Sequence, residues 1–169
     1  MSEGVVLRQA STPDDLVGFG QLVREYVTWL DLDLGFQGLE AELSNLAGVY
    51  GPPKGAILLA VEGPKIAGGV AVKPLPAVGP DACEMKRLYV RPGWRGTGLG
   101  VQLAQGVLAA GRSLGYRRML LDTISDRMGS AVALYRQLGF VERTAYYPSP
   151  IPGTLYLEAD LGGQQGAPS

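Results

Sequence analysis

The segment Arg95-Gly96-Thr97-Gly98-Leu99-Gly100 carries the clearest chemical signal in this sequence. Its three glycines alternate with other residues, directly before a stretch with helical periodicity. Unpaired backbone N–H groups at the start of a helix, together with the positive end of the helix dipole, favour a bound anion and above all a phosphate. Glycine has no Cβ, so a pyrophosphate can approach its backbone closely. We therefore predict that a phosphorylated cofactor binds at Arg95, Gly96, Thr97, Gly98, Leu99 and Gly100.

Three alternatives compete with this interpretation. A dinucleotide fingerprint requires G-x-G-x-x-G, and counting from Gly96 places its last glycine at Val101. A Walker-type loop requires Gly-Lys-Ser or Gly-Lys-Thr after its glycines, and the sequence contains neither. The third alternative is a glycine-rich turn that binds nothing. Ordering three glycines is entropically costly, which favours the phosphate-binding interpretation.

Composition limits the classes of protein that this chain can form. Its 169 residues, of which 46% are hydrophobic, are enough for one globular domain with a sizeable core. The formal net charge of −1 favours neither nucleic acid nor an anionic membrane surface as a partner. No apolar run is long enough to span a bilayer, and the N-terminal residues do not resemble a signal peptide.

The counts of histidine and cysteine exclude several kinds of chemistry. The sequence contains no histidine, which excludes Ser–His and Cys–His catalytic pairs and histidine metal ligands. Its single cysteine, Cys83, cannot form an internal disulfide, so we expect a cytoplasmic location and no bound metal. We expect Cys83 itself to be a small buried side chain.

The glycine-rich segment must lie between a strand and a helix to bind a phosphate in this way. Apolar periodicity predicts a strand over 82–90 before it and a helix over 101–114 after it. The same patterns predict further strands over 5–9, 56–61, 66–72, 118–123, 140–147 and 154–159, and further helices over 11–30, 39–46 and 128–138. We expect a single domain over residues 1–160, followed by a flexible tail over 161–169.

Two motifs fall in this order of elements. The first is Arg95-x-x-Gly98-x-Gly100, and the second is A-x-x-L-Y-x-x-x-G-F over residues 131–140. Together with the element order, they resemble the GNAT superfamily of N-acetyltransferases, and the resemblance covers about residues 4–160. It implies the α/β (α+β) acyl-CoA N-acyltransferase fold, with a central mixed, mostly antiparallel sheet of about six or seven strands and about four flanking helices.

The resemblance also implies a cofactor and a reaction. The co-substrate is acetyl-CoA, and the acetyl group passes to a primary amine of a small molecule, an amino acid or a peptide. In this family the strand before the turn splays from its neighbour and pairs with the pantetheine arm. That role falls on the backbone of Leu88, Tyr89 and Val90, with the Val90 N–H polarising the thioester carbonyl. Where many relatives carry asparagine this chain has Met128, so we expect that contact to be an apolar one from Met128 or to come from Ser125, Ser130 or the backbone.

The same resemblance implies two candidates for proton transfer. Glu84 is the candidate base that removes the ammonium proton through water, and its alternative role is a structural charge paired with Lys86 or Arg87. Tyr135 lies at the family's general-acid position, where a neutral phenol can protonate the departing thiolate. Its alternative role is that of a core aromatic.

Two classes of function fit these residues. One is an enzyme that acetylates an amine, and the other is a non-catalytic acyl-CoA-binding sensor or interaction domain. The pair of Glu84 and Tyr135 favours the enzyme. The resemblance implies that the acceptor site is bordered by Trp29 on one side and by Tyr146 and Tyr147 on the other. Neither these residues nor any motif identifies the acceptor, and the chain fits a monomer as well as a homodimer.

Overall fold

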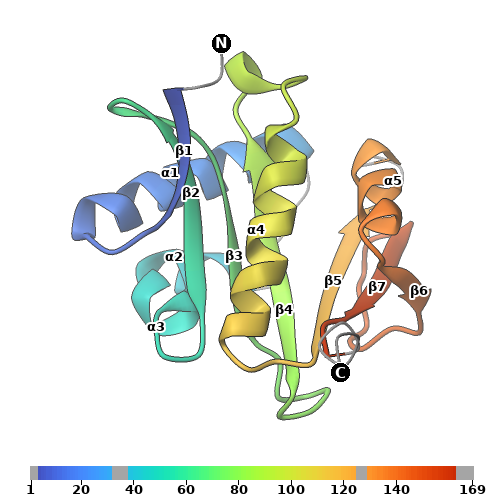
Figure 1. The fold of residues 1–169 in the computed structure, drawn as a ribbon. Helices are drawn as coiled ribbons and strands as arrows, with labels where there is room; N and C mark the ends of the chain where they lie inside the picture. The colour runs from blue at the N-terminus through green and yellow to red at the C-terminus, as the bar shows by residue number, and fades with distance from the viewer. Residues whose placement is uncertain (1–3, 32–37, 125–128, 163–169) are drawn as a thin grey trace, which may run out of the picture.

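A seven-stranded sheet is the centre of the fold in this computed structural model, which describes residues 4–31, 38–124 and 129–162. The strands are β1 (Val5–Gln9), β2 (Ala56–Glu62), β3 (Lys65–Pro74), β4 (Ala82–Val90), β5 (Arg118–Ile124), β6 (Val141–Arg143) and β7 (Thr154–Asp160). Their order across the sheet is β1-β2-β3-β4-β5-β7-β6, and only β4 and β5 pair in parallel (Figure 1). The expected mixed, mostly antiparallel sheet is confirmed.

Helices cover both faces of this sheet. They are α1 (Pro13–Leu30), α2 (Leu39–Ser44), α3 (Leu46–Tyr50), α4 (Leu99–Ser113) and α5 (Gly129–Gln137), with a short 3-10 turn over Pro92–Trp94. The helix α4 packs on β2, β3 and β4 from one face, and α1 and α3 pack on the other (Figure 1). No helix in the described ranges is long and apolar enough to cross a membrane.

Local sequence explains where the helices begin. Thr12 caps α1, because its hydroxyl accepts from the N–H of Asp15 at 3.1 Å and Asp15 accepts in return from the Thr12 N–H at 3.2 Å. The single helix expected over 39–46 is instead two, because Asn45 leaves the helical conformation and its side chain accepts from Gly48 N–H at 3.2 Å. Asn45 is therefore an N-cap within the predicted helix.

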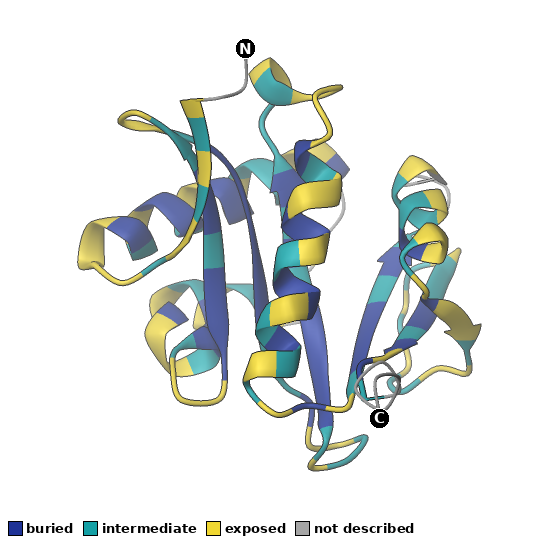
Figure 2. Cartoon of the chain, in the orientation of Figure 1, coloured by how far each residue is buried: buried dark blue, intermediate teal, exposed yellow. Residues whose placement is uncertain are grey.

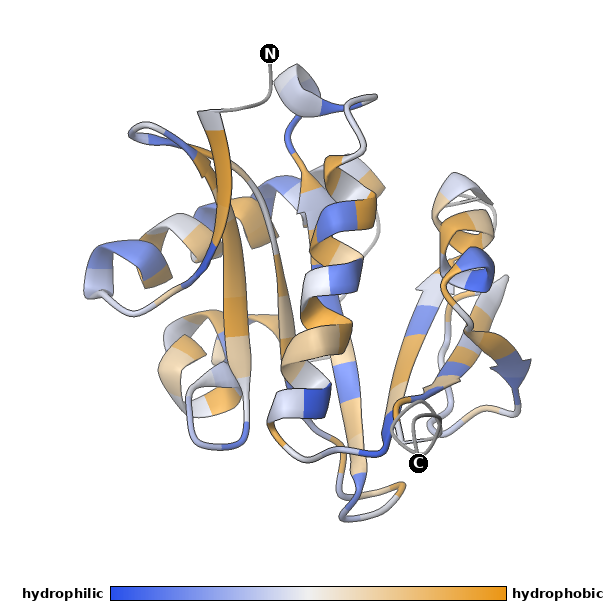
Figure 3. Ribbon diagram, in the orientation of Figure 1, coloured by the Kyte–Doolittle hydropathy of each residue, from blue (hydrophilic) through white to orange (hydrophobic). Residues whose placement is uncertain are grey.

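The described residues form two apolar cores on opposite faces of the sheet, besides a small buried cluster of Leu75, Ala82 and Leu120. The larger is between the sheet and the buried face of α4, which presents residues such as Leu103 and Val107 to the strands and polar residues to solvent (Figures 2 and 3). The smaller surrounds Phe19 and Leu22 of α1. Leu161, which follows β7, is only 1% exposed and packs in the larger core.

The two central strands separate along their length. Pairing between β4 and β5 is recorded for Ala82↔Arg118, Cys83↔Met119 and Glu84↔Leu120. Beyond these pairs β4 continues against β3 as far as Val90, and β5 continues against β7 as far as Ile124. The result is a wedge between β4 and β5 that opens toward the start of α4 (Figure 1).

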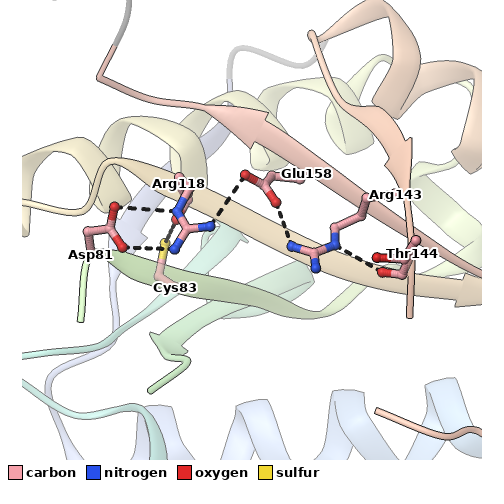
Figure 4. Close-up of polar contacts among 6 residues, drawn as sticks. All are labelled: Asp81, Cys83, Arg118, Arg143, Thr144 and Glu158. Atoms are coloured by element: carbon pink, nitrogen blue, oxygen red, sulfur yellow. Dashed lines mark hydrogen bonds and ion pairs between the residues drawn. The ribbon is translucent and has the colours of Figure 1, made fainter. Parts of the chain in front are cut away.

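Ion pairs stabilise the closed end of this wedge, where β4 and β5 are still paired. Arg118 binds Asp81 at 2.9 Å and lies 3.8 Å from Glu158, which in turn accepts from Arg143 at 2.7 Å (Figure 4). The Cys83 thiol donates to the Arg118 carbonyl at 3.4 Å. Burial raises the pKa of Cys83 to about 12, so it remains a buried thiol as expected. These contacts connect the chain at β4 with β5, β7 and β6 on the side of the sheet where β4 and β5 have not yet separated.

Candidate active site

The glycine-rich turn has the geometry of an anion site. Gly96 and Gly98 have φ of +79° and +84°, in the left-handed region that favours glycine. Gly98 is the N-cap of α4 and offers no side chain to its first N–H groups. A Cβ on Gly98 would meet no atom within 4 Å, so it would project into open space in front of the helix. The strand, the turn and the helix thus meet as predicted.

The two polar side chains of the turn bind its own backbone. The Arg95 Nε donates to the Val90 carbonyl at 2.9 Å, and its guanidinium lies 5.4 Å from the ring centres of both Trp29 and Tyr89. Thr97 donates its hydroxyl to the Trp94 carbonyl at 2.6 Å. Arg95 therefore joins the turn to the end of α1. Its own N–H donates to the Pro92 carbonyl at 3.3 Å, and the first N–H groups of α4 have no side-chain cap.

The backbone of Val90 is oriented toward the wedge. The Arg91 N–H donates to the Ala67 carbonyl at 2.8 Å, which makes these two residues a hydrogen-bonded pair of the β3–β4 ladder. Their neighbours Val90 and Gly68 then form a non-hydrogen-bonded pair, whose N–H and C=O groups point away from each other's strand. The Val90 N–H is thus directed away from β3. Leu88, also on β4, is half-buried and packs against the larger core.

Polar groups line the inside of the wedge. Asp122 and Thr123 border it from β5, and Tyr26 borders it from α1. The hydroxyl of Thr123, which is 5% exposed, has no hydrogen-bond partner among the described residues. A buried hydroxyl without a partner is costly, so its presence here fits a site that a polar ligand completes.

Tyr135 of α5 packs beside this wedge in the larger core. It is 5% exposed and contacts Phe140 edge-to-face at a centroid distance of 5.8 Å. Burial, and then the nearby Tyr26 and Asp122, raise the pKa of Tyr135 above its usual value, so its hydroxyl keeps its proton at neutral pH. Ser130 is exposed at the start of the same helix, and Met128 lies outside the described residues.

Glu84 lies on the opposite face of the sheet from Tyr135. It is 5% exposed and borders a pocket of about 580 Å³ between α2, α3 and the chain after β6. Its carboxylate accepts from the Tyr146 hydroxyl at 2.7 Å and lies 3.5 Å from the Lys73 ammonium. The alternative pairing expected with Lys86 or Arg87 is wrong. Tyr146 and Tyr147 also border this pocket.

A buried ion pair beside this pocket was not predicted. The Arg87 guanidinium donates to both Glu42 oxygens, at 2.6 and 3.0 Å, and the Tyr50 hydroxyl donates to the same carboxylate at 2.6 Å. Burial acts to raise the pKa of Glu42, but the hydrogen bonds and charge of Arg87 outweigh it, and the pKa lies below its usual value. Arg87 has φ of +64° at a bulge in β4, which turns its side chain toward α2.

Removing one hydroxyl from this buried group should weaken the fold. We expect Tyr50→Phe to lower the free energy of unfolding by about 2 kcal/mol, because it removes a hydrogen bond to a charged acceptor. Urea unfolding measures this loss. Tyr116→Phe is the matched control, since its hydroxyl donates at 2.7 Å to the neutral Lys54 carbonyl and its loss should cost about 1 kcal/mol. Equal losses in the two variants would contradict a special role for the Glu42 charge.

Comparison with known proteins identifies the family. The Acetyltransferase (GNAT) family model matches residues 23–140. An uncharacterized N-acetyltransferase of Schizosaccharomyces pombe is 44% identical over 150 residues, covering 88% of this chain and 90% of that protein. An acetyltransferase from Streptococcus agalactiae superposes with a TM-score of 0.73 at 20% identity, covering 94% of this chain and 99% of that one. The PaiA N-acetyltransferase from Thermoplasma acidophilum, solved in complex with coenzyme A, superposes with a TM-score of 0.68 at 14% identity and covers 92% and 98% of the two chains.

The wedge, the uncapped helix start and the order of strands define an acyl-CoA N-acyltransferase fold. This chain belongs to the GNAT family and is an acetyltransferase.

Proposed function

We propose that this acetyltransferase moves the acetyl group of acetyl-CoA directly to a primary amine of a small molecule, an amino acid or a peptide. The observation that carries the proposal is the wedge between β4 and β5, which opens in front of the glycine-rich turn. A pocket for a second reactant borders the same strand from the other face. Direct transfer needs both reactants at one opening in the sheet, and this arrangement is consistent with that requirement.

The residues in the wedge fit the proposed cofactor. The main-chain N–H groups around Gly98 and Gly100 would hold the pyrophosphate, and the backbone from Leu88 to Val90 would pair with the pantetheine arm. The unpartnered hydroxyl of Thr123 would gain a hydrogen bond from the same arm. When bound, acetyl-CoA supplies the acetyl group as a thioester. Cys83 takes no part, because it is buried as a thiol at the closed end of the wedge.

Three groups of the chain would then act on the reaction. Glu84 accepts the ammonium proton of the acceptor, through a water molecule, from the pocket side. The Val90 N–H donates to the carbonyl oxygen as negative charge develops there. Tyr135 lies on the other face of the sheet, and its phenolic hydroxyl donates a proton to the departing sulfur. The positions of Glu84 and Tyr135 on opposite faces support these separate roles.

The proposal is tested by incubating the protein with acetyl-CoA and a panel of amines, amino acids and peptides. We expect thiol release that depends on the acceptor, with an N-acetylated product identified by mass spectrometry. Thiol release without an acetylated amine, or CoA binding without any transfer, would contradict the proposal. The second result would instead support a non-catalytic acyl-CoA-binding domain.

A conservative variant tests the role of Glu84. We expect Glu84→Gln to lower kcat/KM by roughly tenfold, less than a base in direct contact, because water relays the proton. The acidic limb of the pH–rate profile should change with it, and CoA affinity should not. Glu142→Gln is the control, since Glu142 is an exposed carboxylate on β6 that pairs with Arg136 at 3.6 Å. An unchanged pH profile in Glu84→Gln would assign Glu84 a structural role.

A further inference from the structure

The pocket beside Glu84, which we name the acceptor pocket, contains two carboxylates that each have a cation of their own. Glu42 binds Arg87 at 2.6 Å and also accepts from Tyr50. Glu84 lies 3.5 Å from Lys73 and also accepts from Tyr146. Both negative charges are therefore balanced before a substrate arrives.

Lys86 is the remaining charged residue of the acceptor pocket. It is half-buried on β4, and no salt bridge is recorded for it within the described residues. Its charge acts on Glu42, but both oxygens of that carboxylate already accept hydrogen bonds from Arg87 or Tyr50. The described lining of the acceptor pocket thus holds two carboxylates and two ammonium groups, and Lys86 is the one of these four for which no ion pair is recorded.

Lys86 also marks the junction between the two reactant sites. It borders both the acceptor pocket and the wedge between β4 and β5. In a molecule whose amine and carboxylate are attached to the same carbon atom, binding of the carboxylate by Lys86 would therefore place the amine close to the wedge. The rest of the pocket wall is largely carbon and includes Ala41, Val49, Leu75 and Ala77 beside the tyrosine rings.

The geometry points to an acceptor of the free α-amino-acid class, with its carboxylate bound by Lys86 and an apolar side chain in the acceptor pocket. This inference rests on the proposed function and narrows its substrate. Asp122 also borders the wedge, but no salt bridge joins it to Lys86 in the described residues, so an amine without an anionic group would leave the Lys86 ammonium without an ion pair in a partly dehydrated site. Polyamines and other dications would add repulsion to that cost, so the same charge excludes them as good acceptors.

The test compares each amino acid with its own carboxamide. Leucine, methionine and phenylalanine are assayed beside leucinamide, methioninamide and phenylalaninamide, using the wild-type protein and Lys86→Met. The methionine side chain keeps most of the lysine stem and removes the charge. We expect Lys86→Met to raise KM for the amino acids by roughly tenfold or more with kcat nearly unchanged, and to leave the carboxamides within about twofold. For each substrate, the KM of Lys86→Met is divided by the KM of the wild-type protein. Comparing these ratios cancels the difference in basicity between an amino acid and its carboxamide.

Two further variants complete the design. Lys86→Arg should keep the preference for amino acids, because it keeps the charge. Lys65→Met should change nothing, since Lys65 is exposed at the start of β3, just after the turn that follows β2. Equal effects of Lys86→Met on acids and carboxamides, or better transfer to peptides and polyamines than to amino acids, would overturn the inference while the acetyltransferase function stands. No transfer to any amine by a protein that binds CoA would overturn the proposed function, and this inference with it.

Discussion

Gly98→Val should weaken CoA binding by roughly a hundredfold or more in isothermal titration calorimetry. Gly98 caps α4 at φ +84°, where its missing Cβ leaves open the space in front of the helix. A valine side chain would occupy that space and would disfavour the left-handed backbone that directs the N–H groups outward. Loss of close approach and of main-chain hydrogen bonds together amounts to several kcal/mol, which corresponds to this change in affinity.

Backbone strain alone must be separated from loss of the anion site. Gly63 supplies the control, because it has φ +59° in the turn between β2 and β3 and a Cβ there would also meet no atom within 4 Å. Gly63→Val should cost similar folding stability in urea and leave CoA affinity unchanged. If Gly98→Val folds and binds CoA as tightly as the wild-type protein, the turn is not the pyrophosphate site.

Local patterns in the sequence predict the parts of this fold that depend on neighbouring residues. The strand over 82–90 has the predicted bounds, and the glycine-rich turn leads directly into α4 as predicted. Both follow from side-chain periodicity and from the conformational freedom of glycine, which are properties of short segments. The strand expected over 140–147 is only Val141–Arg143, because the tyrosines that follow leave the sheet and border the acceptor pocket.

Contacts between distant residues could not be predicted in the same way. Arg87 and Glu42 are 45 residues apart and come together only because a bulge in β4 gives Arg87 a left-handed backbone. Such a conformation is uncommon for a residue other than glycine, and no local pattern indicates it. For the same reason the sequence alone did not pair Glu84 with Lys73 and Tyr146. These contacts determine which charge remains in the acceptor pocket, so the inference about Lys86 required the structure.

The hydroxyl of Tyr135 is the second group whose removal should have a large effect. Tyr135→Phe keeps the ring against Phe140 and removes only the oxygen, so the free energy of unfolding should change little. We expect kcat to fall roughly 10²-fold or more with the best acceptor, in line with the usual contribution of a general acid. CoA affinity should remain close to that of the wild-type protein, because the turn and β4 are untouched.

The environment of this phenol suits a general acid, which would protonate the departing thiolate in place of water. Burial raises its pKa, so the hydroxyl is neutral throughout the pH range in which the amine is assayed. In the proposed reaction, a buried donor beside the wedge would protonate the departing sulfur where bulk water is excluded. Tyr116→Phe is again the control, since Tyr116 binds Lys54 and lies near the C-terminal end of α4, away from the wedge. If Tyr135→Phe kept full kcat while Tyr116→Phe behaved likewise, solvent would be the proton donor, and the role of Tyr135 would be packing against Phe140 alone.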